Sequence, residues 1–170
     1  MSPLAFLGFG SNMGDREAKF AEVLEALAHL PGTVVERASR LYETEPVGLS
    51  DGGPKFLNSA VIIRTDLTPE ELMSRMREIE LRLGKSPSHR SDMSRAVDLD
   101  LLLYGTERFD KCDVHVPHPR MHLRAFVLVP LAEIAPRAVH PVLRRDMEAL
   151  LLDLPPGDRE QVHPWRPVVN

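Results

Sequence analysis

The chain has 170 residues, which suits one domain over residues 1–170, since most domains contain about 100–200 residues. Hydrophobic residues make up 43% and charged residues 27%, a globular composition that argues against disorder. The formal net charge of −4 argues against a general binder of nucleic acid or anionic membranes, because both need a basic field. One cysteine, Cys112, excludes an intramolecular disulfide and a CxxC metal or redox site.

Neither end of the sequence indicates a membrane or an export signal. No apolar run approaches the ~18 residues of a membrane span. The first residues lack the basic start and the cleavage site of a signal peptide. We therefore expect a cytoplasmic protein, and we expect it to be a monomer.

The first half of the chain predicts three strands and one helix. Apolar residues three and four positions apart follow Asp15 and stop at Pro31-Gly32, a spacing typical of an amphipathic helix. Short apolar or β-branched runs bounded by glycine and proline predict the strands. In order, we expect a strand over Leu4–Phe9, a helix over Asp15–Leu30, a strand over Thr33–Tyr42, a loop over Glu43–Lys55 and a strand over Phe56–Arg64.

The second half begins with a clear helix start. Thr68 is a typical N-cap residue, Pro69 suits the first helical position, and Glu71 completes a capping box. We expect this helix to end at Gly84. Beyond it we expect a loop over Lys85–Arg95, a strand over Ala96–Tyr104, a small strand near Asp113–Val116, a helix over Ala125–Ala135, and a short amphipathic piece at Met147–Leu152 within a proline-rich segment, 140–170.

The main elements therefore follow the order β-α-β-β-α-β. Only a loop separates the second and third strands, so these two should pair in antiparallel fashion. This order predicts an α+β, ferredoxin-like fold, with an antiparallel sheet, helices on one face and further short elements at the C-terminal end. The other face is left for extra segments and a ligand.

Two aspartates alternate with leucines in the strand after the basic loop. Asp98 and Asp100 share one face, ~6.5 Å apart along the strand, while Leu99, Leu101 and Leu103 face the core. Two carboxylates in an apolar strand repel each other and are costly without a compensating charge. Two Mg²⁺ ions would compensate them and suit phosphate chemistry. The alternative is a solvated face of an amphipathic strand.

Two further segments, a basic loop and a glycine-rich segment, bear on which ligand the chain binds. The loop over Lys85–Arg95 holds three cationic residues against one acid, Asp92, and joins the strand of the two aspartates, which suits a polyphosphate substrate. A solvated surface loop is the alternative, and the loop taken by itself does not decide between the two. The glycines of Gly8–Gly14 have a GxGxxxG spacing, so we interpret them as a tight turn capped by Asn12 and Asp15 and not as a dinucleotide site.

Other side chains suit nucleotide or heterocycle binding. His118 lies between two prolines that fix its backbone. A single histidine is usually structural, but the nearby Arg124 supports a phosphate contact as the alternative. Phe56 and Asn58 share one face of a strand, which suits stacking on a flat heterocycle and hydrogen bonding to its edge, although Phe56 alone would be a core residue. Glu80 lies one residue off the buried stripe of its helix, and the pattern does not decide whether it faces a ligand.

Taken together, several stretches resemble the 6-hydroxymethyl-7,8-dihydropterin pyrophosphokinase family of folate biosynthesis. Their order and spacing carry the resemblance, which covers about residues 4–136. The matching stretches are Gly10–Arg16 (GSNMGDR), Tyr42–Gly48 (YETEPVG), Phe56–Asn58 (FLN), Glu80–Gly84 (ELRLG), Arg95–Asp100 (RAVDLD), Val116–Arg120 (VPHPR) and Arg124–Phe126 (RAF).

The resemblance implies a ferredoxin-like enzyme that transfers the β,γ-diphosphate of ATP to the pterin hydroxymethyl oxygen and releases AMP. It implies that Asp98 and Asp100 bind two Mg²⁺ ions and that Lys85 and Arg95 assist the transfer. The implied ATP contacts are Glu80, His118 and Arg124. The implied pterin site is formed by Thr44, Val47, Gly48, Phe56, Asn58 and Phe126.

Three positions depart from the family pattern. Lys85 replaces a common arginine and cannot form the same bidentate fork with phosphate. Asp92 stands where an aromatic lid residue is common, and Glu45 where a proline is common. The altered loop leaves open a homologue that binds pterin or nucleotide without catalysis. The paired aspartates leave open a second alternative, a Mg-dependent nucleotidyltransferase that would release pyrophosphate instead of AMP.

Overall fold

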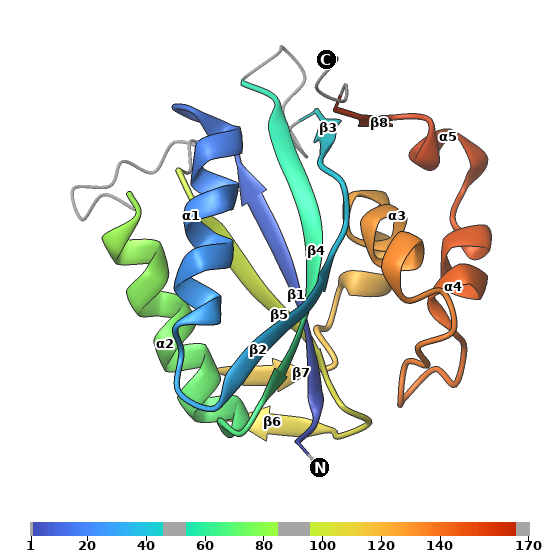
Figure 1. Cartoon of the computed structure of the whole chain (residues 1–170). Helices are drawn as coiled ribbons and strands as arrows, with labels where there is room; N and C mark the ends of the chain where they lie inside the picture. Colours follow the sequence, from blue (N-terminus) through green and yellow to red (C-terminus); the bar gives the residue numbers. More distant parts are fainter. Residues whose placement is uncertain (1, 46–53, 85–95, 166–170) are drawn as a thin grey trace.

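The computed structural model describes residues 2–45, 54–84 and 96–165 (Figure 1). In chain order the larger part contains β1 (Leu4–Ser11), α1 (Arg16–Ala28), β2 (Thr33–Ala38), β3 (Tyr42–Thr44), β4 (Phe56–Thr65), α2 (Pro69–Arg82) and β5 (Asp98–Tyr104). The remaining elements are β6 (Phe109–Lys111), β7 (Val114–Val116), a 3-10 turn (Met121–Leu123), α3 (Ala125–Ile134), α4 (Met147–Asp153), α5 (Pro156–Arg159) and β8 (Val162–Pro164). No helix within these ranges is long and apolar enough to cross a membrane.

The main sheet has the ferredoxin-like topology that the sequence predicts. Its strands lie in the order β5-β1-β4-β3-β8, with β2 paired to the other end of β4, and every neighbouring pair is antiparallel. Each of the helices α1 and α2 joins two strands that have a third strand between them. The predicted pairing of the second and third strands is confirmed by β2 and β4, which meet from Thr33↔Thr65 to Ala38↔Val61.

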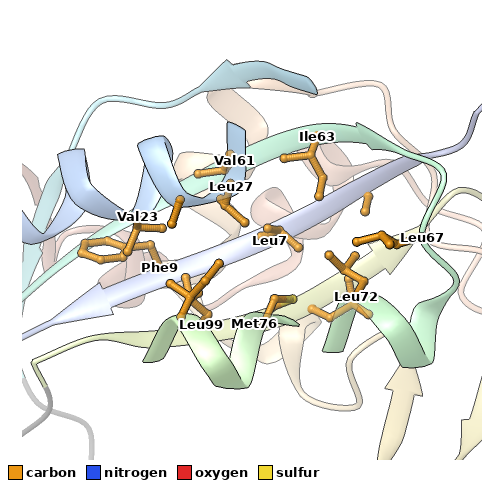
Figure 2. Close-up of a cluster of buried hydrophobic side chains, with 14 of the residues drawn as sticks. Leu7, Phe9, Val23, Leu27, Val61, Ile63, Leu67, Leu72, Met76 and Leu99 are labelled. Atoms are coloured by element: carbon orange, nitrogen blue, oxygen red, sulfur yellow. The ribbon is translucent and has the colours of Figure 1, made fainter. Parts of the chain in front are cut away.

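Helices cover both faces of this sheet (Figure 1). On one face, the apolar stripes of α1 and α2 pack against β1, β4 and β5, with Val23, Leu27, Leu72 and Met76 all fully buried (Figure 2). This is the predicted helical face. On the opposite face, α3 and α4 build a second apolar cluster around Leu128, Leu131 and Met147. The second cluster covers only part of its face, and the uncovered part holds the cavity described below.

The capping predictions for both long helices are confirmed. Asp15 caps α1, since its carboxylate accepts the Ala18 N–H at 3.1 Å. Thr68 and Glu71 form the capping box of α2, in which each side chain accepts the other residue's backbone N–H, at 3.1 and 2.9 Å. These bonds satisfy backbone donors that a helix start otherwise leaves without partners.

Several strand boundaries differ from the prediction. The expected strand Thr33–Tyr42 is two strands, because β2 ends at Ala38 and the chain rejoins β4 as β3, which extends into the expected loop. At the break, the Ser39 N–H still donates to the Ala60 carbonyl at 2.9 Å, but the Ala60 N–H donates to the Ser39 hydroxyl at 3.0 Å, so a side chain replaces one of the two backbone acceptors. The proline-rich end, where we expected only one short amphipathic piece, also contains α5 and β8.

The prediction that Leu103 faces the same core as Leu99 and Leu101 is wrong. The register between β1 and β5 shifts, so that Phe6 faces Leu103 while Leu7 faces Leu101. Leu102 is therefore an extra residue on β5, and the alternation of faces changes after it. Leu103 consequently packs in the second cluster with α3, and Tyr104 packs in the first.

A buried histidine follows α3 and makes the stability of the fold depend on pH. The Nδ1 atom of His140 accepts the backbone N–H groups of Val142 and Leu143 at 3.2 and 3.1 Å, and the residue is 4% exposed. Burial, assisted by the neighbouring positive charge of His122 when protonated, lowers the pKa of His140 below its usual 6.5.

We predict that the free energy of unfolding falls as the pH is lowered below about 6.5. In that range the unfolded chain binds a proton at His140, whereas the folded chain does so only at lower pH. The variant His140→Asn keeps an oxygen that can accept N–H bonds but cannot titrate. Urea unfolding at about pH 7.5 and pH 5.5 should show a smaller pH effect in this variant than in the unaltered chain. Equal pH effects in both chains would contradict the prediction.

Candidate active site

A cavity of about 160 Å³ opens on the sheet face opposite α1 and α2, between the sheet and the start of α3. Strands β1, β3, β4 and β5 and helix α3 all contribute to it. Seven residues that the sequence proposed for the site line this cavity: Thr44, Phe56, Asn58, Asp98, Asp100, Arg124 and Phe126. Residues from distant parts of the sequence therefore meet at one place.

Two glycines create the space beside the two aspartates. Asp98 and Asp100 face Gly10 and Gly8 on the neighbouring strand β1, and all four residues line the cavity. A Cβ atom at Gly10 would come within 3.1 Å of the Asn58 Nδ2 atom. Gly8 lies in β1, inside the predicted strand Leu4–Phe9, and Gly10 also lies in β1, so our interpretation of these two glycines as part of a turn is wrong. Glycine inside a strand often marks a close approach of another group, and that signal was available in the sequence.

Aromatic rings and an amide form another part of the cavity wall. Phe56 and Asn58 point to the same side of β4, as predicted, and Phe126 reaches the cavity from α3. The buried Thr44 hydroxyl donates to the Asn58 Oδ1 atom at 2.7 Å. This bond fixes which way the amide faces and leaves further oxygen lone pairs able to accept N–H groups.

Arg124 and His118 supply the cationic and proton-donating groups. The Arg124 guanidinium lies 5.5 Å from the centre of the Phe126 ring and lines the cavity. His118 does not line the cavity. Its Nδ1 atom accepts the Arg120 N–H at 3.1 Å. Burial lowers the pKa of His118, against the opposing influence of Asp100. Because Nδ1 accepts an N–H group, the neutral form of the ring carries its proton on Nε2, from which it can donate a hydrogen bond.

Glu80 is completely buried between α2 and β5. One carboxylate oxygen accepts the Leu99 N–H at 2.8 Å, and the other accepts from Arg77 at 3.0 Å. Leu99 lies between the two aspartates on β5, which is an edge strand of the sheet. The carboxylate thus takes the place of the missing neighbouring strand at this point.

The two aspartates of the cavity are the candidate ligands for Mg²⁺. Within residues 2–45, 54–84 and 96–165, no group of three or more His, Cys, Asp or Glu side chains could hold a metal ion. Magnesium, however, is usually bound through one or two carboxylates together with water and substrate phosphates. The half-buried pair Asp98 and Asp100, open to the cavity, fits that pattern. Four predicted site residues, Val47, Gly48, Lys85 and Arg95, lie outside the described residues, as does Asp92.

Comparison with known proteins identifies relatives along most of the chain. Residues 6–136 match the family described as 7,8-dihydro-6-hydroxymethylpterin-pyrophosphokinase (HPPK). A 2-amino-4-hydroxy-6-hydroxymethyldihydropteridine pyrophosphokinase of Bacillus subtilis is 42% identical over 134 residues, which cover 79% of each chain. The protein of the same name from Methylorubrum extorquens is 44% identical over 135 residues, covering 79% of this chain and 84% of its own length.

Solved structures share the fold at low sequence identity. Wild-type HPPK-DHPS of Plasmodium falciparum with SDX-DHP superposes with a TM-score of 0.68 at 15% identity over 89% of this chain. An HPPK-DHPS in complex with substrates gives a TM-score of 0.66 at 13% identity. The chain spans less than half of these longer proteins, 44% and 43% respectively. On its sequence match and its fold, the chain belongs to the 7,8-dihydro-6-hydroxymethylpterin-pyrophosphokinase family.

Proposed function

We propose that the chain acts as the pyrophosphokinase of folate biosynthesis, with the cavity on the open sheet face as its active site. It transfers diphosphate from ATP to the hydroxymethyl group of 6-hydroxymethyl-7,8-dihydropterin. The hydroxyl oxygen bonds to the β-phosphorus, the bond between that phosphorus and the α,β-bridging oxygen breaks, and AMP leaves with that oxygen. The observation that carries the proposal is the meeting of paired carboxylates, an arginine and an aromatic-amide wall in one cavity.

The pterin ring would stack between Phe56 and Phe126. Both rings line the cavity, and aromatic faces suit a flat heterocycle. Asn58 and Thr44 are joined by their own hydrogen bond, so their remaining lone pairs are already oriented to accept N–H groups from the pterin edge. Val47 and Gly48 complete the proposed pterin contacts.

The phosphate chain of ATP would lie toward β5 and α3. Asp98 and Asp100 would hold two Mg²⁺ ions, which when bound neutralise charge on the phosphate oxygens. Arg124 adds a fixed positive charge, and the Nε2–H group of His118 donates a hydrogen bond. Lys85 and Arg95 are proposed to assist the transfer. The expected monomeric state and cytoplasmic location stay predictions.

We propose a positioning role for Glu80 in place of the expected ATP contact. Its fully buried carboxylate bonds the backbone between the two aspartates, so it fixes the segment of β5 that carries them. Glu80 therefore acts on the proposed phosphate site indirectly, by holding β5 in place.

The proposed reaction predicts that the purified chain forms AMP only when ATP, Mg²⁺ and 6-hydroxymethyl-7,8-dihydropterin are all present. A coupled AMP assay with each component left out in turn measures this directly. Pyrophosphate in place of AMP would indicate a nucleotidyltransferase. Ligand binding by calorimetry without any AMP would indicate a homologue that binds without catalysis.

The proposed metal role predicts that Asp98→Asn lowers kcat/KM by at least ~100-fold, because the amide removes a negative charge that a bound cation requires. The far-ultraviolet circular dichroism and the thermal unfolding midpoint should remain close to those of the unaltered chain. Asp113→Asn is the matched control, since Asp113 is an exposed carboxylate away from the cavity, and it should keep full activity. Equal activity of the two variants would remove the metal role from Asp98.

The proposed role of Glu80 predicts different outcomes for two substitutions. Glu80→Gln keeps an oxygen for the Leu99 N–H, and the half-exposed Arg77 can turn to solvent, so kcat should stay within ~3-fold of the unaltered value. Glu80→Ala leaves that buried N–H without its acceptor and should lower kcat by ~10-fold or more while costing about 1–3 kcal/mol of unfolding free energy. Steady-state kinetics and urea unfolding measure both effects. If both variants raise the KM for ATP equally, Glu80 contacts the nucleotide through its charge.

A further inference from the structure

The C-terminal residues Pro156–Trp165 lie beyond the region that matches the family, yet they return to the active site (Figure 1). Strand β8 pairs with β3 in the register Tyr42↔Pro164, Glu43↔His163 and Thr44↔Val162. The Trp165 N–H continues this pairing by donating to the Leu41 carbonyl at 2.8 Å. The residue of β3 that lines the cavity, Thr44, is thus paired directly with the C-terminal strand.

Strand β3 has little else to hold its outer edge. It is three residues long and pairs with β4 on its inner side, from Tyr42↔Asn58 to Thr44↔Phe56. In the strand order β5-β1-β4-β3-β8, removal of β8 would make β3 the edge of the sheet. Short edge strands are held weakly, so β8 contributes to the position of Thr44 and of the hydrogen bond from Thr44 to Asn58.

Arg16 links Trp165 to strands β3 and β4. Its guanidinium lies 4.8 Å from the centre of the Trp165 ring, donates to the Lys55 carbonyl at 2.9 Å and pairs with Glu43 at 3.1 Å. Glu43 is on β3, and Lys55 comes directly before Phe56 on β4. A single half-buried cation therefore links the C-terminal segment to both strands that carry the proposed pterin contacts.

The C-terminal segment also forms the wall of a second cavity, of about 230 Å³, next to the first. Asp158, Gln161 and Val162 line it from the C-terminal side. Thr44, Glu45, Arg124 and Phe126 line both cavities, so the two adjoin each other. Val162 and Phe126 both pack against the α3–α4 cluster, and β8 contacts α3.

We propose that Pro156–Trp165 is a positioning element for the pterin half of the active site. It holds β3 with Thr44 from one side and supports the wall behind Phe126 from the other. The aspartate pair on β5 is separated from β3 by the two strands β1 and β4, so the segment does not act on the proposed metal pair. The segment shares the second cavity with Arg124, but its strand pairing and its link through Arg16 hold the strands of the pterin wall, so its main effect falls on pterin binding. This inference rests on the proposed function, because it assigns the Thr44–Asn58–Phe126 wall to the pterin.

A pair of truncations tests the proposal in the otherwise complete chain. A chain that ends at Glu160 lacks β8 and Trp165, whereas a control chain that ends at Trp165 keeps every contact described above. At saturating ATP and Mg²⁺, the shorter chain should show a KM for the pterin raised by ~10-fold, with the KM for ATP and kcat within ~2-fold. The control chain should match the full chain in all three constants.

The point variant Trp165→Ala keeps the test decisive if circular dichroism shows that the shorter chain does not fold. It removes the ring beneath Arg16 but keeps the pairing of β8 with β3, and it should raise the KM for the pterin by ~3-fold. An unchanged KM for the pterin in a folded variant, or an equal rise in both KM values, overturns the proposal. Absence of AMP formation by the full chain would instead overturn the proposed function, so the two failures are distinguishable.

Discussion

The active site depends on placing two negative charges side by side on one face of an otherwise apolar strand. Asp98 and Asp100 are separated by a fully buried leucine that belongs to the core on the other face. In the proposed function, a bound dication with a polyphosphate would balance the charge of these two carboxylates. The glycines opposite them on β1 leave the space in which those ligands can approach. The buried Glu80 then fixes the backbone between them.

This arrangement requires a sheet with two different faces. One face is filled by the apolar stripes of α1 and α2 and supplies the packing that holds β1, β4 and β5 together (Figure 2). The other face is only partly covered, by α3 and α4, and its uncovered part carries the polar residues of the cavity. The two faces are linked by the alternation of side chains along each strand. Where one residue packs under α1 and α2, the residues before and after it point to the open face.

Local sequence signals predicted the elements whose causes are themselves local. The capping box at Thr68 and Glu71, the stripe of α2 and the alternation at Asp98 and Asp100 are each formed by residues of one short segment of the chain. Features that depend on a distant partner were missed. Strand β8 is three residues long, contains Pro164 and is defined only by its pairing with β3. Strand β1 continues to Ser11, beyond the predicted end at Phe9, because it pairs there with β4 and β5, and the displacement of Leu103 arises from a register shift against β1.

The break in the sheet at Ser39 has a consequence for how the protein can vary. A buried hydroxyl pair, Ser39 with Ser59 at 2.8 Å, marks the point where the long strand β4 changes partners, from β2 to β3. The stretch of β4 paired with β2 packs into the core, whereas the stretch paired with β3 lines the cavity. Substitutions along β3 and β8 are therefore expected to change ligand recognition with little effect on the core, while substitutions on the other side of this junction are limited by close packing.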